Sequence, residues 1–180
     1  AQNSSLPPIT EKGIDNETWT QMILSQQMYS SEGLLIKTDI KEVCVRFLAS
    51  EVPCYEGTQN PERLDILGYD SSDHALIAFE IKGPKAGRVE LENLFLQGIE
   101  HRNWLEKNKM AVKLLFDRGP KGKRINTRKR VKLLLGYYGN EVPHLFYELR
   151  EQSLRRDPYT EIGFVNLSQK SDKVVVRNFR

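Results

Sequence analysis

The sequence predicts an α/β domain in which helices flank a central sheet. Short apolar runs bounded by turn-forming residues alternate along the chain with longer amphipathic stretches. The chain has 180 residues, enough for one sizeable core, and is 39% hydrophobic and 28% charged, unlike a disordered chain. No apolar run approaches the roughly 18 residues of a membrane helix, and no membrane partner is expected.

The chain is predicted to start with a linker followed by one added helix. Residues 1–14 do not begin with Met and lack the pattern of a signal peptide, which predicts a linker or trimmed terminus. The domain could therefore come from a longer protein. Residues 15–180 are predicted to form a single domain with its core at about 38–138. Its first helix is predicted over residues 15–30, with these residues on one side: Trp19, Met22, Ile23 and Tyr29.

A second helix is predicted over residues 39–50, where apolar residues follow helical spacing. Asp39 and Glu42 have the spacing of a capping box, which would explain Glu42 as a helix-start residue. The apolar stripe consists of Ile40, Val43, Cys44, Phe47 and Leu48.

Two neighbouring strands are predicted over residues 63–69 and 75–82, joined by a turn-forming segment that contains Asp70 and Asp73. Side chains alternate between the two faces of a strand, so Glu80 and Lys82 end one face of the second strand. A hairpin would bring Asp65 of the first strand towards Glu80. Charges that close a buried strand need a partner or a metal ion. The alternative is a surface ion pair between Glu80 and Lys82, with Asp65 solvated.

The rest of the chain is predicted to add a helix over 88–108, strands over 111–116 and 131–138, and a helix over 145–156. A terminal hairpin is predicted over 161–167 and 173–179. On the 88–108 helix, three residues cluster along one flank of the apolar stripe: Gln97, His101 and Trp104.

These segments resemble the PD-(D/E)XK nuclease superfamily. The resemblance rests on residues 63–68 (RLDILG), residues 79–82 (FEIK) and the following helix with Gln97, and it covers roughly residues 38–118. One departure is that Leu64 stands before Asp65 where the motif has Pro.

The resemblance implies a restriction-endonuclease-like core: a central mixed sheet flanked by helices, with an added N-terminal helix and a C-terminal helix and hairpin extension. It implies that Asp65, Glu80 and the backbone carbonyl of Ile81 bind Mg²⁺, with Mn²⁺ able to substitute, because hard cations prefer oxygen ligands. Lys82 would orient or activate the attacking water, and Gln97 would face the site.

Two further acidic residues and one histidine are left open by the resemblance. Family members often carry another Glu on the first core helix, and the candidates here are Glu42 and Glu51. The helical wheel places Glu42 opposite the apolar stripe, and Glu51 lies at the far end of the helix. Neither is assigned to the site. His101 stands where some members carry Tyr, so its role is also left open.

One segment concentrates the positive charge of the chain. Residues 118–132 hold eight of its 27 basic residues and no acidic residue, which leaves 19 basic against 24 acidic residues elsewhere. Glycine and proline in this segment predict an exposed loop that contacts nucleic-acid phosphates, or alternatively a merely solvated loop. The predicted contacts are Arg118, Lys121, Lys123, Arg124, Arg128, Lys129 and Arg130.

The sequence thus predicts a Mg²⁺-dependent nuclease that hydrolyses DNA phosphodiester bonds in restriction, repair or processing. The alternative is a non-cleaving nucleic-acid-binding or assembly module of the same fold. RNA as the substrate, endonuclease or exonuclease action, homodimerisation and partner domains all stay open. Cys44 and Cys54 do not form a zinc-binding pattern, and two plain thiols are typical of a reducing, cytoplasmic compartment.

Overall fold

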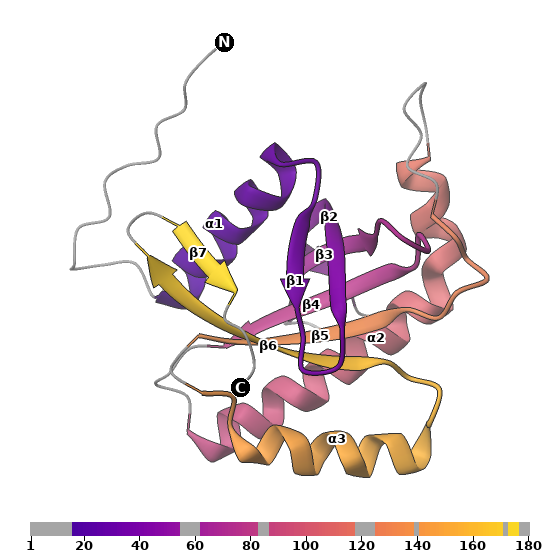
Figure 1. Cartoon of the computed structure of the whole chain (residues 1–180). Helices are drawn as coiled ribbons and strands as arrows, with labels where there is room; N and C mark the ends of the chain where they lie inside the picture. The colour runs from indigo at the N-terminus through magenta and orange to yellow at the C-terminus, as the bar shows by residue number, and fades with distance from the viewer. Residues whose placement is uncertain are drawn as a thin grey trace.

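One sheet of seven strands forms the centre of the structure, with helices on both faces (Figure 1). The computed structural model describes residues 16–54, 62–82, 87–117, 125–138, 141–170 and 173–176. Within these ranges the elements are α1 (Asn16–Ser30), β1 (Leu34–Lys37), β2 (Glu42–Pro53), β3 (Arg63–Asp70), β4 (Leu76–Lys82), α2 (Arg88–Phe116), β5 (Lys132–Tyr138), α3 (His144–Arg156), β6 (Ile162–Lys170) and β7 (Lys173–Val176).

The strands lie side by side in chain order from β1 to β7. Strands β4, β5 and β6 are parallel, and the other neighbours are antiparallel. Parallel neighbours need a crossover, and α2 and α3 provide the two crossovers here. The chain therefore has the predicted α/β fold with a mixed sheet.

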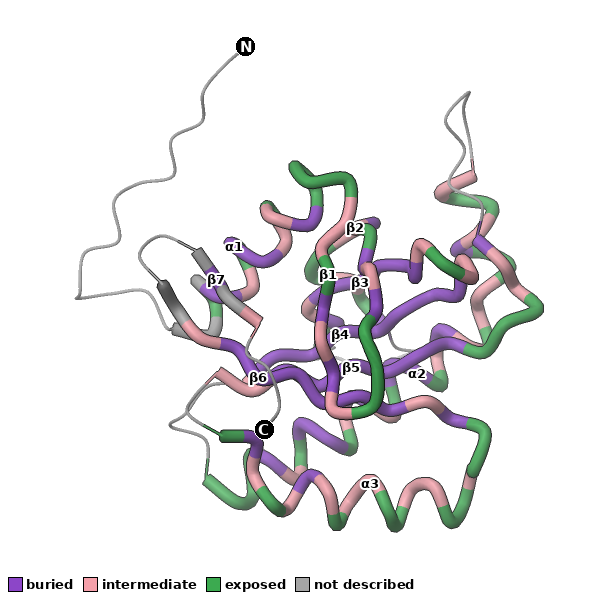
Figure 2. The backbone as a smooth tube through the Cα atoms, in the orientation of Figure 1, coloured by how far each residue is buried: buried purple, intermediate pink, exposed green. Residues whose placement is uncertain are grey.

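Both faces of the central strand β4 are buried, as Figure 2 shows for the middle of the sheet. Ile77, Phe79 and Ile81 pack in the cluster that contains α1. Leu76 and Ala78 pack in the cluster that contains α2. Helices on both faces explain why β4 reads as a continuous apolar run that becomes polar only at its end.

Helix α2 lies close to the sheet where it crosses β5. A Cβ added at Gly98 would lie only 2.9 Å from Cδ2 of Leu135, so the missing side chain permits this approach. The helix is amphipathic over most of its length, and no helix in the described ranges has an apolar stretch long enough to span a bilayer. The close approach brings the next turn of α2 within reach of β4.

The prediction of a helix over residues 39–50 is wrong, because this segment is the turn of the β1–β2 hairpin and most of its second strand, β2. Val43 and Val45 are buried with the period of a strand, and Ile40 of the supposed stripe is exposed. A register shift between Phe47 and Ala49 moves the next buried residue out of phase. That shift made strand periodicity resemble helical spacing.

The capping box predicted for Asp39 and Glu42 is therefore also wrong. Asp39 Oδ1 accepts the backbone N–H of Phe164 at 2.9 Å, and Oδ2 lies 2.6 Å from Arg150. These contacts attach the β1–β2 turn to β6 and α3. Glu42 is exposed and lies 3.7 Å from Lys37 across the hairpin.

The strand predicted over residues 111–116 is wrong too, since these residues continue α2 to Phe116. Val112 is buried, whereas Leu114 and Leu115 are exposed, so the apolar run does not mark a buried strand. The predicted strands over 63–69, 75–82 and 131–138 and the helices over 15–30, 88–108 and 145–156 are confirmed. The terminal hairpin is confirmed as far as it is described, and residues 177–179 of its predicted second strand lie outside the described residues. In this hairpin, β6 belongs to the central sheet beside β5.

Helix α1 is confirmed, but its buried side agrees only in part with the predicted one. Ile23 is buried as predicted, whereas Met22 and Tyr29 are exposed, and Leu24 and Met28 are buried instead. The side chain of Trp19 lies outside the described part of the structure.

A buried ion cluster fixes the β3–β4 turn to β5. Nζ of Lys132 lies 2.6 Å from Oδ2 of Asp70 and 2.8 Å from Oδ2 of Asp73. Burial opposes ionisation of Asp70, but hydrogen bonds from Lys132 and Ser72 outweigh it and lower the pKa of Asp70. Lys132 thus holds one end of the hairpin and is not exposed to a polyanion.

We expect Lys132→Met to lower the free energy of unfolding by about 3 kcal/mol at pH 7, because it leaves Asp70 charged, buried and unpaired. Because the pKa of Asp70 is lowered in the folded protein, its stabilising effect is present above its usual pKa and disappears as the pH falls through the lower value. The deficit of the variant should therefore shrink between pH 7 and pH 3.5 in urea unfolding. Lys129→Met, at an exposed lysine, should change little, and an equal loss in both variants would contradict this account.

Candidate active site

The candidate site lies where β3 and β4 separate. The last paired residues of the two strands at this end are Ile66 and Phe79. In the same register the next two residues to face each other are Asp65 and Glu80, and both side chains are on the face covered by α2. The hairpin thus brings together the two carboxyl groups that the sequence predicted to meet.

Asp65 replaces the missing strand pairing with its side chain. The backbone N–H of Ile81 donates to Oδ2 of Asp65 at 2.7 Å. The carboxyl groups of Asp65 and Glu80 are themselves hydrogen-bonded, and the backbone N–H of Asp65 donates to Glu80. Two carboxyl groups this close are not both ionised unless a cation lies between them. Without a cation, they share a proton.

Glu80 is the most buried acidic group of the site, with 2% of its surface exposed. The pKa of Glu80 is raised to about 8, mainly by burial and also by the charges of Glu62 and Glu51, while the hydrogen bonds from Asp65 partly oppose this rise. At neutral pH Glu80 therefore holds a proton in the cation-free protein.

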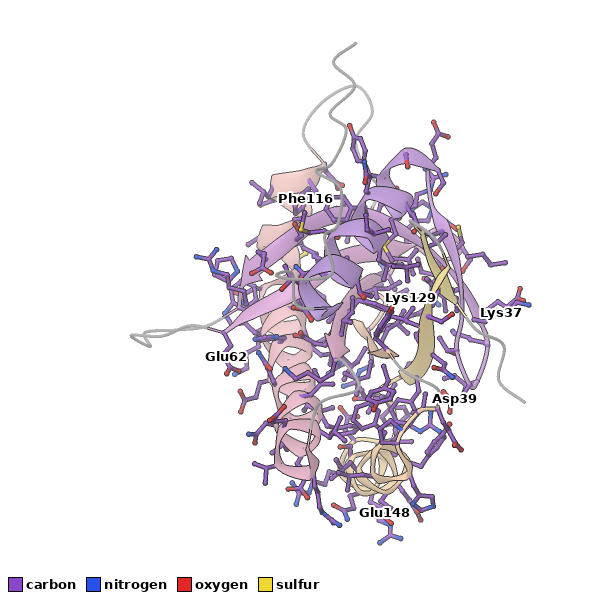
Figure 3. The ribbon with its side chains drawn as sticks, turned by 90° about the vertical axis from the view of Figure 1, so that its left-hand side faces the viewer. Lys37, Asp39, Glu62, Phe116, Lys129 and Glu148 are labelled. Carbon is purple, nitrogen blue, oxygen red and sulfur yellow. The ribbon has the colours of Figure 1, made fainter. Side chains whose placement is uncertain are left out.

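His101 of α2 contacts Glu80 directly, although the sequence left its role open. Nδ1 of His101 lies within hydrogen-bond distance of Oε1 of Glu80, and the ring also hydrogen-bonds the backbone of Glu62, which Figure 3 shows beside α2. Burial lowers the pKa of His101. The contact therefore joins a carboxyl group whose pKa is raised to an imidazole whose pKa is lowered. The signal in the sequence was the position of His101 one turn after Gln97.

The other predicted side chains, Lys82 and Gln97, lie on the two elements that carry Glu80 and His101. Lys82 is half-buried at the end of β4 and leaves the strand on the same face as Glu80. Gln97 is half-buried on α2, one turn before His101. The role of the Ile81 carbonyl as a ligand stays a prediction.

Of the two further acidic candidates, Glu51 lies near the site and Glu42 does not. Glu51 is exposed near the end of β2 with a φ of 54°, and its charge acts on Glu80. Nε2 of Gln21 on α1 donates to Oε1 of Glu51 at 2.7 Å and to the backbone oxygen of Asp65 at 3.1 Å. Sequence reasoning missed Gln21, because nothing in the spacing of α1 connects it to β2 and β3.

The side chains at this site fit a hard divalent cation in their chemistry. Within the described ranges, no group of three or more His, Cys, Asp or Glu side chains is arranged to hold a metal ion. Asp65 and Glu80 instead provide two carboxyl groups, with Glu62 and Glu51 adding negative charge nearby. A cation would compete for the place of the proton that now joins the two groups.

Only part of the predicted basic segment can be placed. Arg118, Lys121, Lys123 and Arg124 lie outside the described residues. Arg128 and Lys129 are exposed just before β5. Arg130 is bonded to Asp157 at 3.1 Å.

The exposed basic residues lie away from the carboxyl pair along the sheet. In the β4–β5 register Leu135 faces Glu80, whereas Lys132, which begins β5, faces Ile77. Three residues of strand span roughly 10 Å, and Arg128 and Lys129 come before that point.

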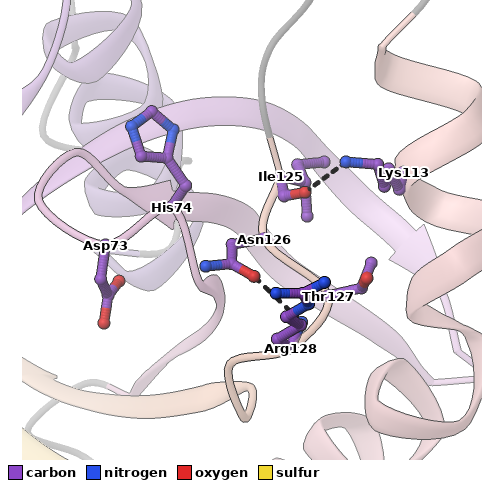
Figure 4. A pocket seen from close by; sticks show the side chains of 7 residues that line it. All are labelled: Asp73, His74, Lys113, Ile125, Asn126, Thr127 and Arg128. Atoms are coloured by element: carbon purple, nitrogen blue, oxygen red, sulfur yellow. Dashed lines mark hydrogen bonds between the residues drawn. The ribbon is translucent and has the colours of Figure 1, made fainter.

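A pocket of about 460 Å³ lies beside these basic residues (Figure 4). It is formed between the β3–β4 turn and the segment before β5, at the end of the hairpin opposite Glu80. Nζ of Lys113 donates to the backbone oxygen of Ile125 in its wall at 2.7 Å. The lining residues are Asp73, His74, Lys113, Ile125, Asn126, Thr127 and Arg128.

Comparison with known proteins gives one distant similarity. No protein-family model matches the chain, and no curated protein matches it. Among solved structures, the chain is similar to SfsA of Pyrococcus furiosus in complex with Ca²⁺, with 16% sequence identity and a TM-score of 0.34. The match covers 74% of this chain and 53% of the other, so the chain spans about half the length of SfsA.

In the presence of a chelator we expect the stability of the parent protein to depend on pH, and we expect Glu80→Gln to remove most of this dependence. The pKa of Glu80 is raised from 4.5 to about 8 by folding, so the folded protein binds a proton that the unfolded chain releases between these values. Stability of the parent protein should therefore fall by several kcal/mol as the pH rises through this window, since each pKa unit is worth ~1.4 kcal/mol. Glutamine imitates the protonated acid, so the variant should be the more stable protein at pH 8.

Urea unfolding at pH 5, 6, 7 and 8 in the presence of a chelator measures this difference. Glu42→Gln, at an exposed acid on the same sheet, is the matched control and should keep the slope of the parent. An unchanged slope in Glu80→Gln would show that Glu80 is ionised at neutral pH.

Proposed function

We propose that this chain is a divalent-metal-dependent nuclease with a restriction-endonuclease-like fold, in which Asp65, Glu80 and Lys82 form the active site. The observation that carries the proposal is the meeting of two carboxyl groups where β3 and β4 separate, two residues before a lysine on the same face. A purely structural role would not explain two acidic groups forced to share a proton in a buried place.

The residues of the site have separate roles in this proposal. Asp65 and Glu80 would hold Mg²⁺ or Mn²⁺, with the Ile81 carbonyl as a further ligand. When bound, the cation lowers the pKa of a water molecule and stabilises negative charge on the phosphate. Lys82 places a positive charge beside the same phosphate and orients the water. Gln97 would donate a hydrogen bond to the phosphate or to a carboxylate ligand.

The proposed substrate is DNA. The exposed basic residues support this proposal, because they could bind the phosphates of a polyanion. Arg128 and Lys129 lie more than roughly 10 Å along the sheet from the carboxyl pair, counted from the strand register. Successive phosphates of one strand rise by about 3.4 Å along the duplex axis, so these residues would contact phosphates several nucleotides from the cleaved bond.

We expect Asp65→Asn and Glu80→Gln each to reduce Mg²⁺-dependent nicking of supercoiled plasmid by at least about 100-fold, because each loses a charged ligand. Lys82→Ala should reduce nicking by about 100-fold and leave metal binding unchanged. Initial rates in Mg²⁺ and in chelator, followed by gel electrophoresis, provide the measurement.

The control is Glu42→Gln, which alters an acid of the same sheet that pairs with Lys37 far from the site. It should nick at the rate of the parent. If the parent protein binds DNA in chelator but does not cleave it in Mg²⁺ or Mn²⁺, the chain is a non-cleaving binding module. Parallel assays on linear, single-stranded and branched DNA and on RNA identify the preferred substrate.

We expect the double variant Arg128→Ala and Lys129→Ala to weaken DNA binding and to lower the slope of log affinity against log salt by about 2. The reason is the loss of two phosphate contacts. Fluorescence anisotropy with a labelled duplex in Ca²⁺-free buffer and chelator separates binding from cleavage. The double variant Lys37→Ala and Arg46→Ala removes the same charge from a half-buried position on β1 and an exposed position on β2, and it should keep the parent slope.

A further inference from the structure

The segment that leads into β5 is fixed from two sides where it begins. From α2, Nζ of Lys113 donates to the backbone oxygen of Ile125 at 2.7 Å. From the β3–β4 turn, the backbone oxygen of His74 accepts the N–H of Asn126 at 2.9 Å. The two walls of the pocket in Figure 4 are therefore bonded to each other by backbone groups.

The next residues form a tight turn that one of its own side chains closes. Oδ1 of Asn126 accepts the N–H of Arg128 at 3.0 Å, and the backbone oxygen of Asn126 accepts the N–H of Lys129 at 3.2 Å. Nζ of Lys109 on α2 donates to the backbone oxygen of Lys129 at 3.4 Å. The turn thus holds Thr127 and Arg128 in place at the wall of the pocket.

The opposite wall contains a residue in an uncommon conformation. His74 has a φ of 62°, in the left-handed region that residues other than glycine seldom adopt. Its N–H donates to the backbone oxygen of Asp70 at 2.8 Å, and its ring stacks on that of Tyr69 with the centroids 5.9 Å apart. Such conformations persist where neighbouring contacts impose them, and they concentrate at ligand-binding sites.

The acid and the lysine of this pocket are already engaged by the protein. Oδ2 of Asp73 lies 2.8 Å from Nζ of Lys132, and its Oδ1 accepts the N–H of Ala75 at 3.0 Å. Lys113 lies 3.1 Å from Oδ2 of Asp117, in addition to its bond to the backbone. The groups that remain for a ligand are therefore on the turn.

Three consecutive residues of the turn offer such groups. They are the amide nitrogen of Asn126, the hydroxyl of Thr127 and the guanidinium of Arg128. Within the described parts of the chain, none of these three groups has a hydrogen-bond or ion-pair partner. A guanidinium can bind a phosphate through two parallel hydrogen bonds, whereas an amide and a hydroxyl suit the polar edge of a base or a sugar.

The size of the pocket indicates more than a phosphate. Its volume of about 460 Å³ lies within the range of roughly 300–1,000 Å³ of pockets for small molecules and cofactors. A nucleotide combines a phosphate with a polar ring of suitable size. In a duplex the bases are paired inside the helix, so a base can enter a pocket of the protein only from an unpaired nucleotide.

We propose that this pocket binds one unpaired nucleotide of a nucleic-acid strand, with the phosphate on Arg128 and the base beside Asn126 and Thr127. The inference rests on the proposed function in taking nucleic acid as the ligand. It adds the class of substrate, which is a strand with an unpaired nucleotide several positions from the cleaved bond. A free nucleotide has the same chemistry, and the experiment separates the two sources.

The test measures binding in chelator, where cleavage does not interfere. Fluorescence anisotropy compares a labelled duplex that carries one bulged nucleotide with the fully paired duplex of the same sequence. The parent protein should bind the bulged duplex at least about 10-fold more tightly, as expected for one base held by a protein. The two duplexes have nearly equal charge, so this ratio does not report phosphate contacts alone.

Thr127→Leu fills part of the pocket and removes the hydroxyl, and the ratio should fall towards one. Thr127→Ser keeps both the space and the hydroxyl, and it should keep most of the ratio. Gln152→Leu introduces the same side chain at an exposed position of α3 outside the pocket and should keep the parent ratio. A ratio of two affinities does not depend on the folded fraction, so partial unfolding of a variant does not obscure the result.

Competition with deoxyadenosine monophosphate identifies the source of the nucleotide. The free nucleotide lacks the neighbouring phosphates, so displacing the bulged duplex should require at least about a 10-fold higher concentration of it than of unlabelled bulged duplex. If the free nucleotide binds and Thr127→Leu weakens it, while the parent binds both duplexes equally, the pocket takes a free nucleotide and the inference is overturned. A Thr127→Leu variant that keeps the parent ratio overturns it as well.

The outcomes also separate this inference from the proposed function. If the parent binds no nucleic acid, both are wrong. If the parent nicks plasmid in Mg²⁺ but binds the two duplexes equally, only the role of the pocket is wrong. If the ratio depends on Thr127 and no nucleic acid is cleaved, the pocket is confirmed and the nuclease proposal is wrong.

Discussion

The structure depends on the separation of β3 and β4 beyond Ile66 and Phe79. Backbone groups that lose their strand partners in a buried place need others, and here Asp65 accepts the N–H of Ile81. The same separation leaves Glu80 facing Asp65 at a point where β3 and β4 are no longer paired. A negative charge is then costly on either group alone, and the cost is met by a shared proton in the cation-free protein. The two acidic groups, their burial and the separation of β3 and β4 therefore depend on one another.

The surrounding elements keep this arrangement in place from three sides. Helix α2 approaches closely at Gly98 and brings His101 against Glu80. Helix α1, on the other face, reaches the backbone of Asp65 through Gln21. At the far end of the hairpin, Lys132 fixes the turn to β5. The hairpin is thus anchored at its turn and supported by side chains at its open end, where β3 and β4 no longer pair with each other.

Much of this site could be predicted from the sequence because its residues are local. Asp65 and Glu80 are joined by one short hairpin, and strand alternation together with the turn composition places them opposite each other. Gln97 and His101 follow on one helix with helical spacing. Contacts between distant segments could not be predicted in this way. Gln21 reaches Glu51 across 30 positions of the chain, and no local pattern records such a contact.

The two errors in secondary structure have different causes. Around Phe47 the register shift breaks the alternation of β2, and the apolar residues that result have the spacing of a helix. Around Leu114 an apolar run suggested a buried strand, although only Val112 of this last part of α2 is buried. Periodicity reports burial on regular elements, and it misleads where a strand is irregular or where apolar side chains stay in solvent.

For the proposed nuclease, the distance between the basic residues and the carboxyl pair has a consequence for turnover. A long strand of nucleic acid can contact Arg128, Lys129 and the carboxyl groups at once. A fragment of one or two nucleotides can reach only one of these places. Each cut would therefore divide a molecule held at two points into pieces held at one. Short products would leave readily, and the end that still contacts the basic segment would stay close for another round.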